Sequence, residues 1–243
     1  MLRRNLCFLA ALLICSLPFV ARGQEYDVFL LLGQANMAGR GEMLPSDEEI
    51  IDDNLYLLDS DGDVELACSP LNRYSTIKKP GAKQGIGPGH SFGKMMARST
   101  GHKVLLVVNA RGGSKLSEWQ KGSETGYFEE TVRRADQAIR HGGKVKAILW
   151  HHGEGDCRDT TYLSRLAVMV QAMRAELGDD QIPFIACELA RWRDASKGFN
   201  KRLPQITEYI SNSSYITTQD CSMLKDTGDP NFGREGQMYL GER

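Results

Sequence analysis

Hydrophobic and polar positions alternate along the chain in the manner of an α/β protein. Short, almost wholly apolar runs are typical of buried parallel strands, and the longer segments between them carry apolar residues at helical spacing. The apolar runs 26–32, 103–108, 145–150 and 182–189 predict strands, and 215–218 predicts a last short one. Segments 127–141 and 160–177 predict helices, 204–210 the end of a helix, and 234–241 the start of a final one.

A hairpin interrupts this alternation near the N-terminal side. Residues 54–58 and 64–67 flank an acidic segment whose Asp61-Gly62 dipeptide predicts a tight turn. The acidic segment lacks the residue order and the distal glutamate of a calcium-binding loop. Strands that alternate with helices predict a three-layer α/β/α sandwich around a central parallel sheet. Ligands bind such sheets beyond the carboxyl ends of the strands.

The first 23 residues have the pattern of a secretory signal peptide. Two arginines precede the apolar run Leu6–Val20. The small residues Ala21 and Gly23 occupy positions −3 and −1 before the expected cleavage site. The run is shorter than the ~20 residues that span a bilayer, and Pro18 interrupts it. We expect cleavage before Gln24, a single domain over residues 24–243, and a secreted or periplasmic protein without a membrane attachment.

Composition narrows the function classes. The chain has 243 residues, of which 41% are hydrophobic and 25% charged, so disordered, collagen-like and coiled-coil proteins are excluded. Basic and acidic residues number 30 and 31, and no basic stripe of a nucleic-acid-binding protein is present. Loss of the signal peptide would leave 27 basic and 31 acidic residues, so the mature protein would be mildly acidic. The remaining cysteines allow three disulfide pairings or stay buried thiols, and no C-x-x-C pair suggests zinc: Cys68, Cys157, Cys187 and Cys221.

Four glycine-bearing polar segments follow predicted strands or open the last helix. They are 33–39 (GQANMAG), 109–114 (NARGGS), 150–156 (WHHGEGD) and 229–236 (DPNFGREG). Each alone is compatible with a tight turn. Because the carboxyl ends of parallel strands meet at one edge of the sheet, the four together predict a functional site there.

The order and spacing of these motifs resemble the sialate O-acetylesterase and acetylxylan esterase branch of the SGNH hydrolases, over nearly the whole of residues 26–243. The resemblance implies a flavodoxin-like fold and removal of acetyl groups from sugar hydroxyls, with neither metal nor other cofactor. It also implies a serine nucleophile after the first strand. A C-terminal histidine would take the serine proton, and an aspartate would orient that histidine.

The sequence departs from this pattern at the catalytic positions. Ala35 stands at the nucleophile position, and a methyl group cannot attack a carbonyl. No histidine follows His152, so the family histidine has no counterpart; its place falls on Asn231, by substitution or by a one-residue deletion. Asp229 is the best remnant of the aspartate, one residue closer than the family spacing. Loss of a nucleophile or base costs on the order of 10⁶ in turnover in serine hydrolases.

The resemblance also assigns the remaining site residues. An oxyanion hole would form from the backbone of Ala35, from Gly112 and Gly113, and from the side chain of His152, which replaces the family's glutamine. The candidates for contact with substrate are Gln34, Asn36, Arg40, Arg111, Trp119 and Glu154. Trp119 could present a face to a sugar ring, although an aromatic residue here is about as often part of the core.

The sequence therefore predicts a carbohydrate O-acetylesterase-family protein that has lost catalysis and binds an acetylated carbohydrate or glycan. An alternative is an active carbohydrate esterase that uses other groups. A metal held by His151, His152, Glu154 and Asp156 is disfavoured, because side chains diverge in a loop after a strand. Another alternative is an altered or truncated form of an ordinary acetylesterase, since the chain stops within the final helix. Nothing supports an adhesive surface module.

Overall fold

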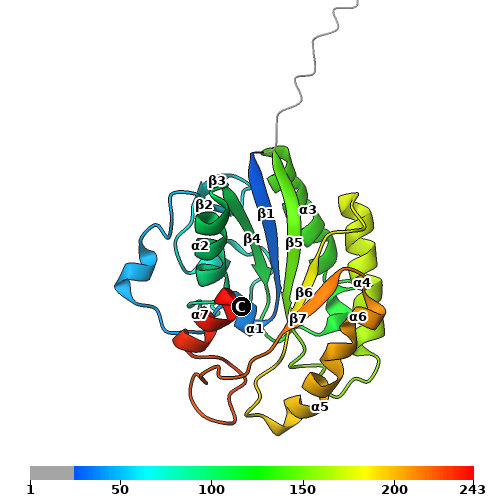
Figure 1. The fold of residues 1–243 in the computed structure, drawn as a ribbon. Helices are drawn as coiled ribbons and strands as arrows, with labels where there is room; N and C mark the ends of the chain where they lie inside the picture. The colour runs from blue at the N-terminus through cyan, green and yellow to red at the C-terminus, as the bar shows by residue number, and fades with distance from the viewer. Residues whose placement is uncertain (1–24) are drawn as a thin grey trace, which may run out of the picture.

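A seven-stranded sheet forms the centre of the protein, in the order β3-β2-β4-β1-β5-β6-β7 (Figure 1). This computed structural model describes residues 25–243, so the expected signal peptide lies outside the described residues. The strands are β1 (Tyr26–Gly33), β2 (Leu55–Leu58), β3 (Val64–Leu66), β4 (Val104–Ala110), β5 (Gly143–His151), β6 (Phe184–Cys187) and β7 (Ser213–Ile216).

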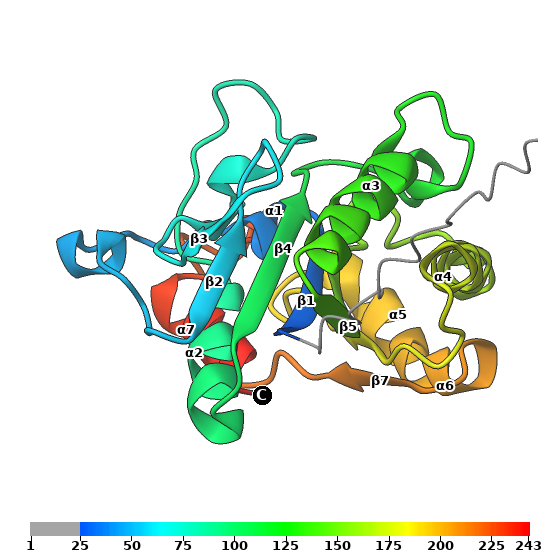
Figure 2. The ribbon, with the colours of Figure 1, turned by 90° about the horizontal axis from the view of Figure 1, so that it is seen from above.

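Helices cover both faces of this sheet, as the view from above shows (Figure 2). The helices α2 (Gly89–Thr100) and α7 (Arg234–Glu242) lie on one face. The other face carries α3 (Tyr127–Arg140), α4 (Tyr162–Leu177), α5 (Asp194–Arg202) and α6 (Ile206–Tyr209). A single turn of helix, α1 (Ala35–Ala38), follows β1. No helix within residues 25–243 is long and apolar enough to cross a bilayer.

The expected α/β/α fold class is confirmed, with one difference in the sheet. Strands β2 and β3 pair antiparallel through the predicted hairpin, and every other neighbouring pair is parallel. The sheet is therefore mixed, because two strands joined by a tight turn must run in opposite directions. The Asp59 side chain stabilises this turn by accepting hydrogen bonds from the backbone N–H groups of Asp61, Gly62 and Asp63.

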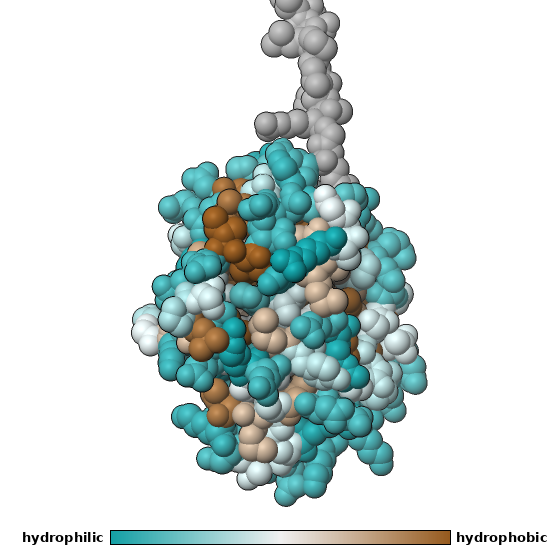
Figure 3. Space-filling view, turned by 60° about the vertical axis from the view of Figure 1, so that its left-hand side comes forward, coloured by the Kyte–Doolittle hydropathy of each residue, from teal (hydrophilic) through white to brown (hydrophobic). Residues whose placement is uncertain are grey.

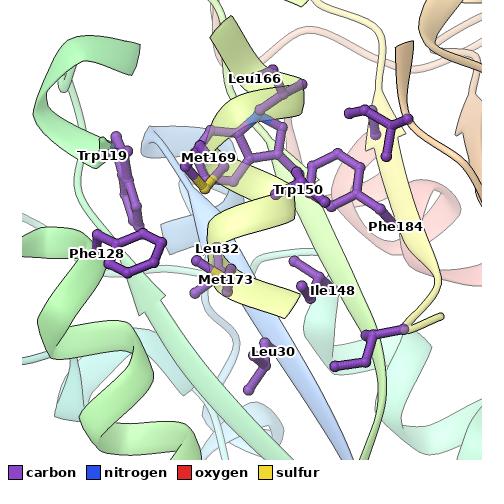
Figure 4. Close-up of a cluster of buried hydrophobic side chains, with 14 of the residues drawn as sticks. Leu30, Leu32, Trp119, Phe128, Ile148, Trp150, Leu166, Met169, Met173 and Phe184 are labelled. Carbon is purple, nitrogen blue, oxygen red and sulfur yellow. The ribbon is translucent and has the colours of Figure 1, made fainter. Parts of the chain in front are cut away.

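Strand β1 is buried on both sides, which explains its continuous apolar run. Leu30 and Leu32 enter the hydrophobic cluster beneath α3 and α4, which Figure 4 shows. Phe29 and Leu31 enter the cluster beneath α2. Alternate side chains of a strand point to opposite faces, so a strand between two helical layers has no face left for polar residues.

One element boundary and the exposure of one helix position differ from the sequence pattern. The strand predicted over 182–189 ends at Cys187, and the Glu188 carboxylate after it accepts the N–H of Thr218 at 3.0 Å. The helix predicted over 127–141 is present, but its Ile139 is exposed. In the helix predicted over 160–177, the apolar residues at helical spacing are buried: Leu163, Leu166, Val170 and Met173.

The register of the central strands places three loops side by side. Gly33 at the end of β1 pairs with Ala110 at the end of β4 and with His151 at the end of β5. Three of the four polar motifs therefore begin at one edge of the sheet. The loop before α7 brings the fourth motif to the same edge, as the contacts of Asn36 show below.

Candidate functional site

Ala35 lies just beyond the carboxyl end of β1, at the first residue of α1. The turn that places it depends on Gly33, which has φ +135, a conformation that favours glycine. A Cβ on Gly33 would lie 2.2 Å from the carbonyl oxygen of His151. The N–H of Gln34 donates to that same oxygen at 2.8 Å. At position 33 the backbones of β1 and β5 therefore lie too close together for any side chain. Ala35 is half-buried at this edge of the sheet.

The second motif lies against Ala35. The N–H of Arg111 donates to Gly33 O at 2.9 Å, and a Cβ on Gly112 would lie 3.5 Å from Ala35 Cβ. The Gln34 amide donates to Ser114 O and is 2% exposed. Gln34, expected to contact substrate, therefore joins the two loops from within. Gly112 lies next to Ala35, and its role in an oxyanion hole stays a prediction.

The Asn36 side chain is a clamp between distant segments. Its Nδ2 donates to Glu154 Oε1 at 2.8 Å and to Pro230 O at 3.0 Å. Its Oδ1 accepts from the N–H of Phe232 at 3.1 Å and from Gln237 Nε2 at 3.2 Å. Both amide protons and both oxygen lone pairs are thereby used. Asn36 is fully buried, so it positions the first, third and fourth motifs against each other.

The fourth motif brings the positions of the missing histidine and its aspartate into contact. Asp229 Oδ1 accepts the N–H of Asn231 at 2.9 Å and its side-chain Nδ2 at 2.7 Å. The Trp192 indole N–H donates to Asp229 O at 2.7 Å and fixes the loop from the side. Asn231 Oδ1 is buried without a partner in the described part of the chain. A residue spacing shorter than the family's therefore still permits the side-chain contact.

His152 lies in an aromatic enclosure rather than on an open rim. Its ring stacks on Trp150 and Tyr162, and its Nδ1 lies 3.0 Å from the Tyr162 hydroxyl. Nε2 is buried, and the ring also interacts with the Ser114 backbone. Burial lowers the pKa of His152 to about 3, so the ring is neutral near pH 7 and carries one N–H. Its role as an oxyanion donor stays a prediction.

Glu154 carries an unusual carboxyl group. Oε1 accepts the Asn36 amide, whereas Oε2 is buried and has no partner within residues 25–243. Burial raises the pKa of Glu154 to about 6, because an ionised carboxylate loses its hydration there. This carboxyl group is hydrogen-bonded to Asn36, the residue that follows Ala35. Its charge changes between mildly acidic and neutral pH.

Two further residues expected to contact substrate, Trp119 and Arg111, make their contacts with the protein itself. Trp119 is fully buried between Trp150 and Tyr127, and its indole N–H donates to the Ser114 hydroxyl at 2.9 Å (Figure 4). It belongs to the core and offers no face to a sugar ring, which corrects that expectation. The half-buried Arg111 donates to Ile77 O at 2.7 Å and lies over the Tyr127 ring at 5.4 Å.

The histidine pair does not converge on one point. His152 points into the layer of Trp119 and Trp150, whereas the His151 ring lies on the other face against Phe232, at 5.5 Å. Burial lowers the pKa of His151 to about 4. The part of the chain that the structure describes contains no group of three His, Cys, Asp or Glu side chains arranged to hold a metal ion.

An apolar hollow of about 210 Å³ lies beside the site but does not include Ala35. It is lined by residues of α1, α2 and α7 and of the strands β1 and β5 to β7, among them Met37 of the first motif and His151 of the third. The surface shown in Figure 3 is mostly hydrophilic, with small hydrophobic patches between. The candidate site is the edge that carries Ala35 and Gly112, and the hollow lies behind the first and third motifs without reaching Ala35.

Sequence reasoning missed one basic side chain at this edge. A Cβ on Gly113 would lie 3.0 Å from Lys79 Nζ. Lys79 belongs to no motif, and the only signal for it is the basic composition of segment 78–83. Arg40, which the sequence analysis did single out, lies at the preceding glycine: a Cβ on Gly112 would lie 2.9 Å from its Nη2.

Comparisons with known proteins agree with this geometry. The family described as "Carbohydrate esterase, sialic acid-specific acetylesterase" matches residues 25–243. A probable carbohydrate esterase of Arabidopsis thaliana is 30% identical over 236 residues, which cover 88% of this chain and 87% of that protein. The X-ray structure of the same Arabidopsis protein superimposes with a TM-score of 0.77 at 25% identity, covering 90% of this chain and 95% of that one.

More distant structures share the fold. A carbohydrate acetylesterase from Xanthomonas citri has a TM-score of 0.60 at 18% identity, and 88% of this chain covers 54% of that one. NanS has a TM-score of 0.59 at 18% identity, with coverage of 82% and 79%. The match over residues 25–243, together with the ordered loops around Ala35, leads to one conclusion: this chain belongs to the sialic acid-specific acetylesterase family of carbohydrate esterases.

Proposed function

We propose that the protein binds O-acetylated carbohydrate and does not hydrolyse it. One observation carries this proposal: the residue that lies against Gly112 at the end of β1 is Ala35, whose side chain is a methyl group. Nucleophilic catalysis of ester hydrolysis requires a hydroxyl or thiol at that point, with a base beside it. A methyl group supplies neither a nucleophile nor a proton to be removed.

The position of the base supports the same proposal. Asn231 occupies the loop position next to Phe232, and its amide has no useful basicity near neutral pH. The surrounding framework is nevertheless intact, since Asn36 and Gln34 still hold the loops together. A site that keeps its shape and loses its reacting groups is suited to binding. The acetylated sugar as ligand comes from the family to which the chain belongs.

The test compares the native protein with an Ala35→Ser/Asn231→His double variant. Hydrolysis of 4-nitrophenyl acetate and of an O-acetylated methyl glucoside is followed for both, and binding of the sugar is followed by calorimetry. The proposal expects no hydrolysis above background by the native protein, measurable binding of the sugar, and hydrolysis by the double variant. Hydrolysis by the native protein would overturn the proposal and would direct attention to Glu154 as a base for water.

Export belongs to the same proposal. The support is the sequence pattern of residues 1–23, with its apolar run Leu6–Val20 and the cleavage site before Gln24. An extracellular or periplasmic protein would meet glycans directly. Expression of the full chain in a secreting host, followed by N-terminal sequencing of the released protein, should give Gln24 as the first residue. Retention of Met1 in a cytosolic fraction would contradict it.

A further inference from the structure

Two of the four cysteines within residues 25–243 share one small apolar cluster between the sheet and α7. Cys187 is the last residue of β6, and its side chain is buried in this cluster. Cys221 lies in the loop after β7, is half-buried, and packs against the same cluster. The other buried members are Ala190, Phe232 and Leu240. The structure records both cysteines as thiols, in an apolar layer that brings a strand and a later loop together.

Hydrogen bonds hold the segment before Cys221 against the residues that follow Cys187. The N–H of Thr218 donates to Glu188 Oε2 at 3.0 Å, and the Thr218 hydroxyl donates to Leu189 O at 2.9 Å. The N–H of Cys221 then closes a turn by donating to Thr218 O at 3.3 Å. This turn is therefore fixed beside the end of β6, where Cys187 lies.

The other two cysteines lie in different parts of the fold. Cys68 follows β3, which forms the opposite edge of the sheet from β7. Cys157 lies in the loop after β5 and packs against the larger cluster beneath α3 and α4. Of the three pairings that the sequence allows, one unites the two cysteines that share a cluster in the described part of the chain.

From this arrangement we infer that Cys187 and Cys221 are joined by a disulfide in the exported protein, whereas Cys68 and Cys157 stay thiols. The two thiols together lose two protons and two electrons and form one S–S bond. The electrons pass to an external disulfide, such as oxidised glutathione, which is reduced to two thiols. The inference rests on the proposed export for one premise, an oxidising compartment.

Burial decides when this bond can form. Burial raises the pKa of Cys221 to about 11. Burial, and after it the nearby Cys221 thiol, raise the pKa of Cys187 well above its ordinary value. Because the thiolate is the group that attacks a disulfide, both thiols react slowly in the folded protein. We therefore expect the bond to form while the chain folds, before the cluster closes over Cys187.

The bond would fasten the loop that carries the fourth motif. Ser222, the residue after Cys221, accepts the N–H of Gly233 on its backbone oxygen at 3.0 Å. The N–H of Leu224 donates to Asn231 O at 2.9 Å. These hydrogen bonds close the loop onto the segment that begins at Cys221. A disulfide at Cys221 therefore ties the position of the missing histidine to the central sheet.

Peptide mapping tests the pairing directly. The full chain is secreted from an expression host, its free thiols are alkylated in denaturant without reduction, and its tryptic peptides are weighed by mass spectrometry. Each cysteine falls in a different tryptic peptide, and these peptides span residues 41–73, 147–158, 175–191 and 203–225. We expect peptides 175–191 and 203–225 as one species that separates on reduction. Four alkylated cysteines in the secreted protein, or any other linked pair, overturn the inference.

A second arm of the experiment does not depend on export. The reduced, unfolded full chain is refolded in a mixture of reduced and oxidised glutathione and mapped in the same way. The linked pair after refolding, from a chain that the host retains with Met1 in place, supports the inference and overturns the export. Four thiols after refolding, in a protein that still binds the acetylated sugar, overturn the inference and leave the proposed function standing.

Variants assign the effect of the bond to its two cysteines. The oxidised protein should melt about 5–10 °C above the reduced one, because a cross-link restricts the unfolded chain. Cys187→Ala and Cys221→Ala should each abolish this difference, and Cys157→Ala is the matched control that should keep it. Trypsin should cut after the exposed Lys225 several-fold more slowly in the oxidised protein.

The second of these variants keeps the test decisive. Cys221 is half-buried, so Cys221→Ala removes less packing than Cys187→Ala and serves if the latter fails to fold. A difference in Tm between oxidised and reduced protein that persists in Cys221→Ala overturns the pairing, because another bond would then be responsible. Its loss in Cys221→Ala, with retention in Cys157→Ala, supports the pairing.

Discussion

The Asn231 side-chain amide donates to Asp229 Oδ1 at 2.7 Å, within one loop before α7. An imidazole at position 231 could donate from Nδ1 to the same oxygen, as the histidine of a hydrolase triad donates to its aspartate. The Ala35→Ser/Asn231→His double variant should therefore hydrolyse an acetyl ester about 10²-fold or more above the native rate, since a positioned base contributes about that much. Initial rates with 4-nitrophenyl acetate measure it.

The contact with Asp229 supplies the control for this variant. Adding Asp229→Asn to the double variant should lower the rate again, because the imidazole would lose the carboxylate that orients it. Ala35→Ser alone should stay near background, because no base removes its proton. A double variant whose rate is insensitive to Asp229 would contradict the orienting role of this carboxylate.

Glu154 should make the folded state less stable as the pH rises. Its pKa is raised from 4.5 to about 6, so the folded protein holds this proton more tightly than the unfolded chain does. The favourable contribution is complete below pH 4.5 and is lost as the pH rises through about 6. Glu154→Gln keeps the oxygen that accepts from Asn36 and removes the charge. We expect it to be more stable by about 2 kcal/mol at pH 7.5.

Urea unfolding at pH 4.5, 6 and 7.5 measures this difference. The gain from Glu154→Gln should vanish at the lowest pH, where the wild-type carboxyl group is already protonated. A gain of the same size at every pH would show that the amide improves packing and that ionisation plays no part.

His152 should produce the opposite dependence in acid. Its pKa is lowered from 6.5 to about 3, so between these pH values the unfolded chain binds a proton at His152 that the folded protein does not bind. Stability is therefore lost as the pH falls below 6.5, and the loss is complete near pH 3, reaching several kcal/mol. His152→Gln should flatten this acid limb of the stability curve.

Trp119 should matter for stability and not for ligand binding. Trp119→Phe keeps most of the buried apolar surface and loses the hydrogen bond to the Ser114 hydroxyl, which costs about 1–2 kcal/mol. Sugar affinity of the folded variant should equal that of the native protein. Trp192→Phe should behave differently, because its indole N–H holds Asp229 O in the fourth motif. A large loss of affinity in Trp119→Phe would contradict the core position.

Local sequence patterns foretold the elements of the fold better than the roles within the site. Buried strands such as β1 can be recognised in the sequence by a continuous apolar run, because helices cover both faces of the strand. The Asp61-Gly62 hairpin was readable for a similar local reason. The early end of β6 depends on the Glu188 carboxylate meeting Thr218, a contact made only in the folded chain.

The site divides along the same line. The four motifs could be placed at one edge because parallel strands end together. The burial of Trp119 and the saturation of Asn36 could not be predicted, since each depends on partners from distant segments. Lys79 carries no motif at all, and only the approach of its ammonium to Gly113 reveals it.

Ala35 and Asn36 are adjacent residues whose side chains differ completely in the contacts they make with the rest of the molecule. The asparagine ties three loops together through its amide, whereas the alanine methyl group ties nothing. Reactivity and architecture are therefore assigned to adjacent codons that can change independently. An alanine codon becomes a serine codon, and an asparagine codon a histidine codon, by a single base change each. Under the proposed function, two such changes at positions 35 and 231 would exchange a binding protein for a hydrolase while Asn36 keeps the surrounding loops in place.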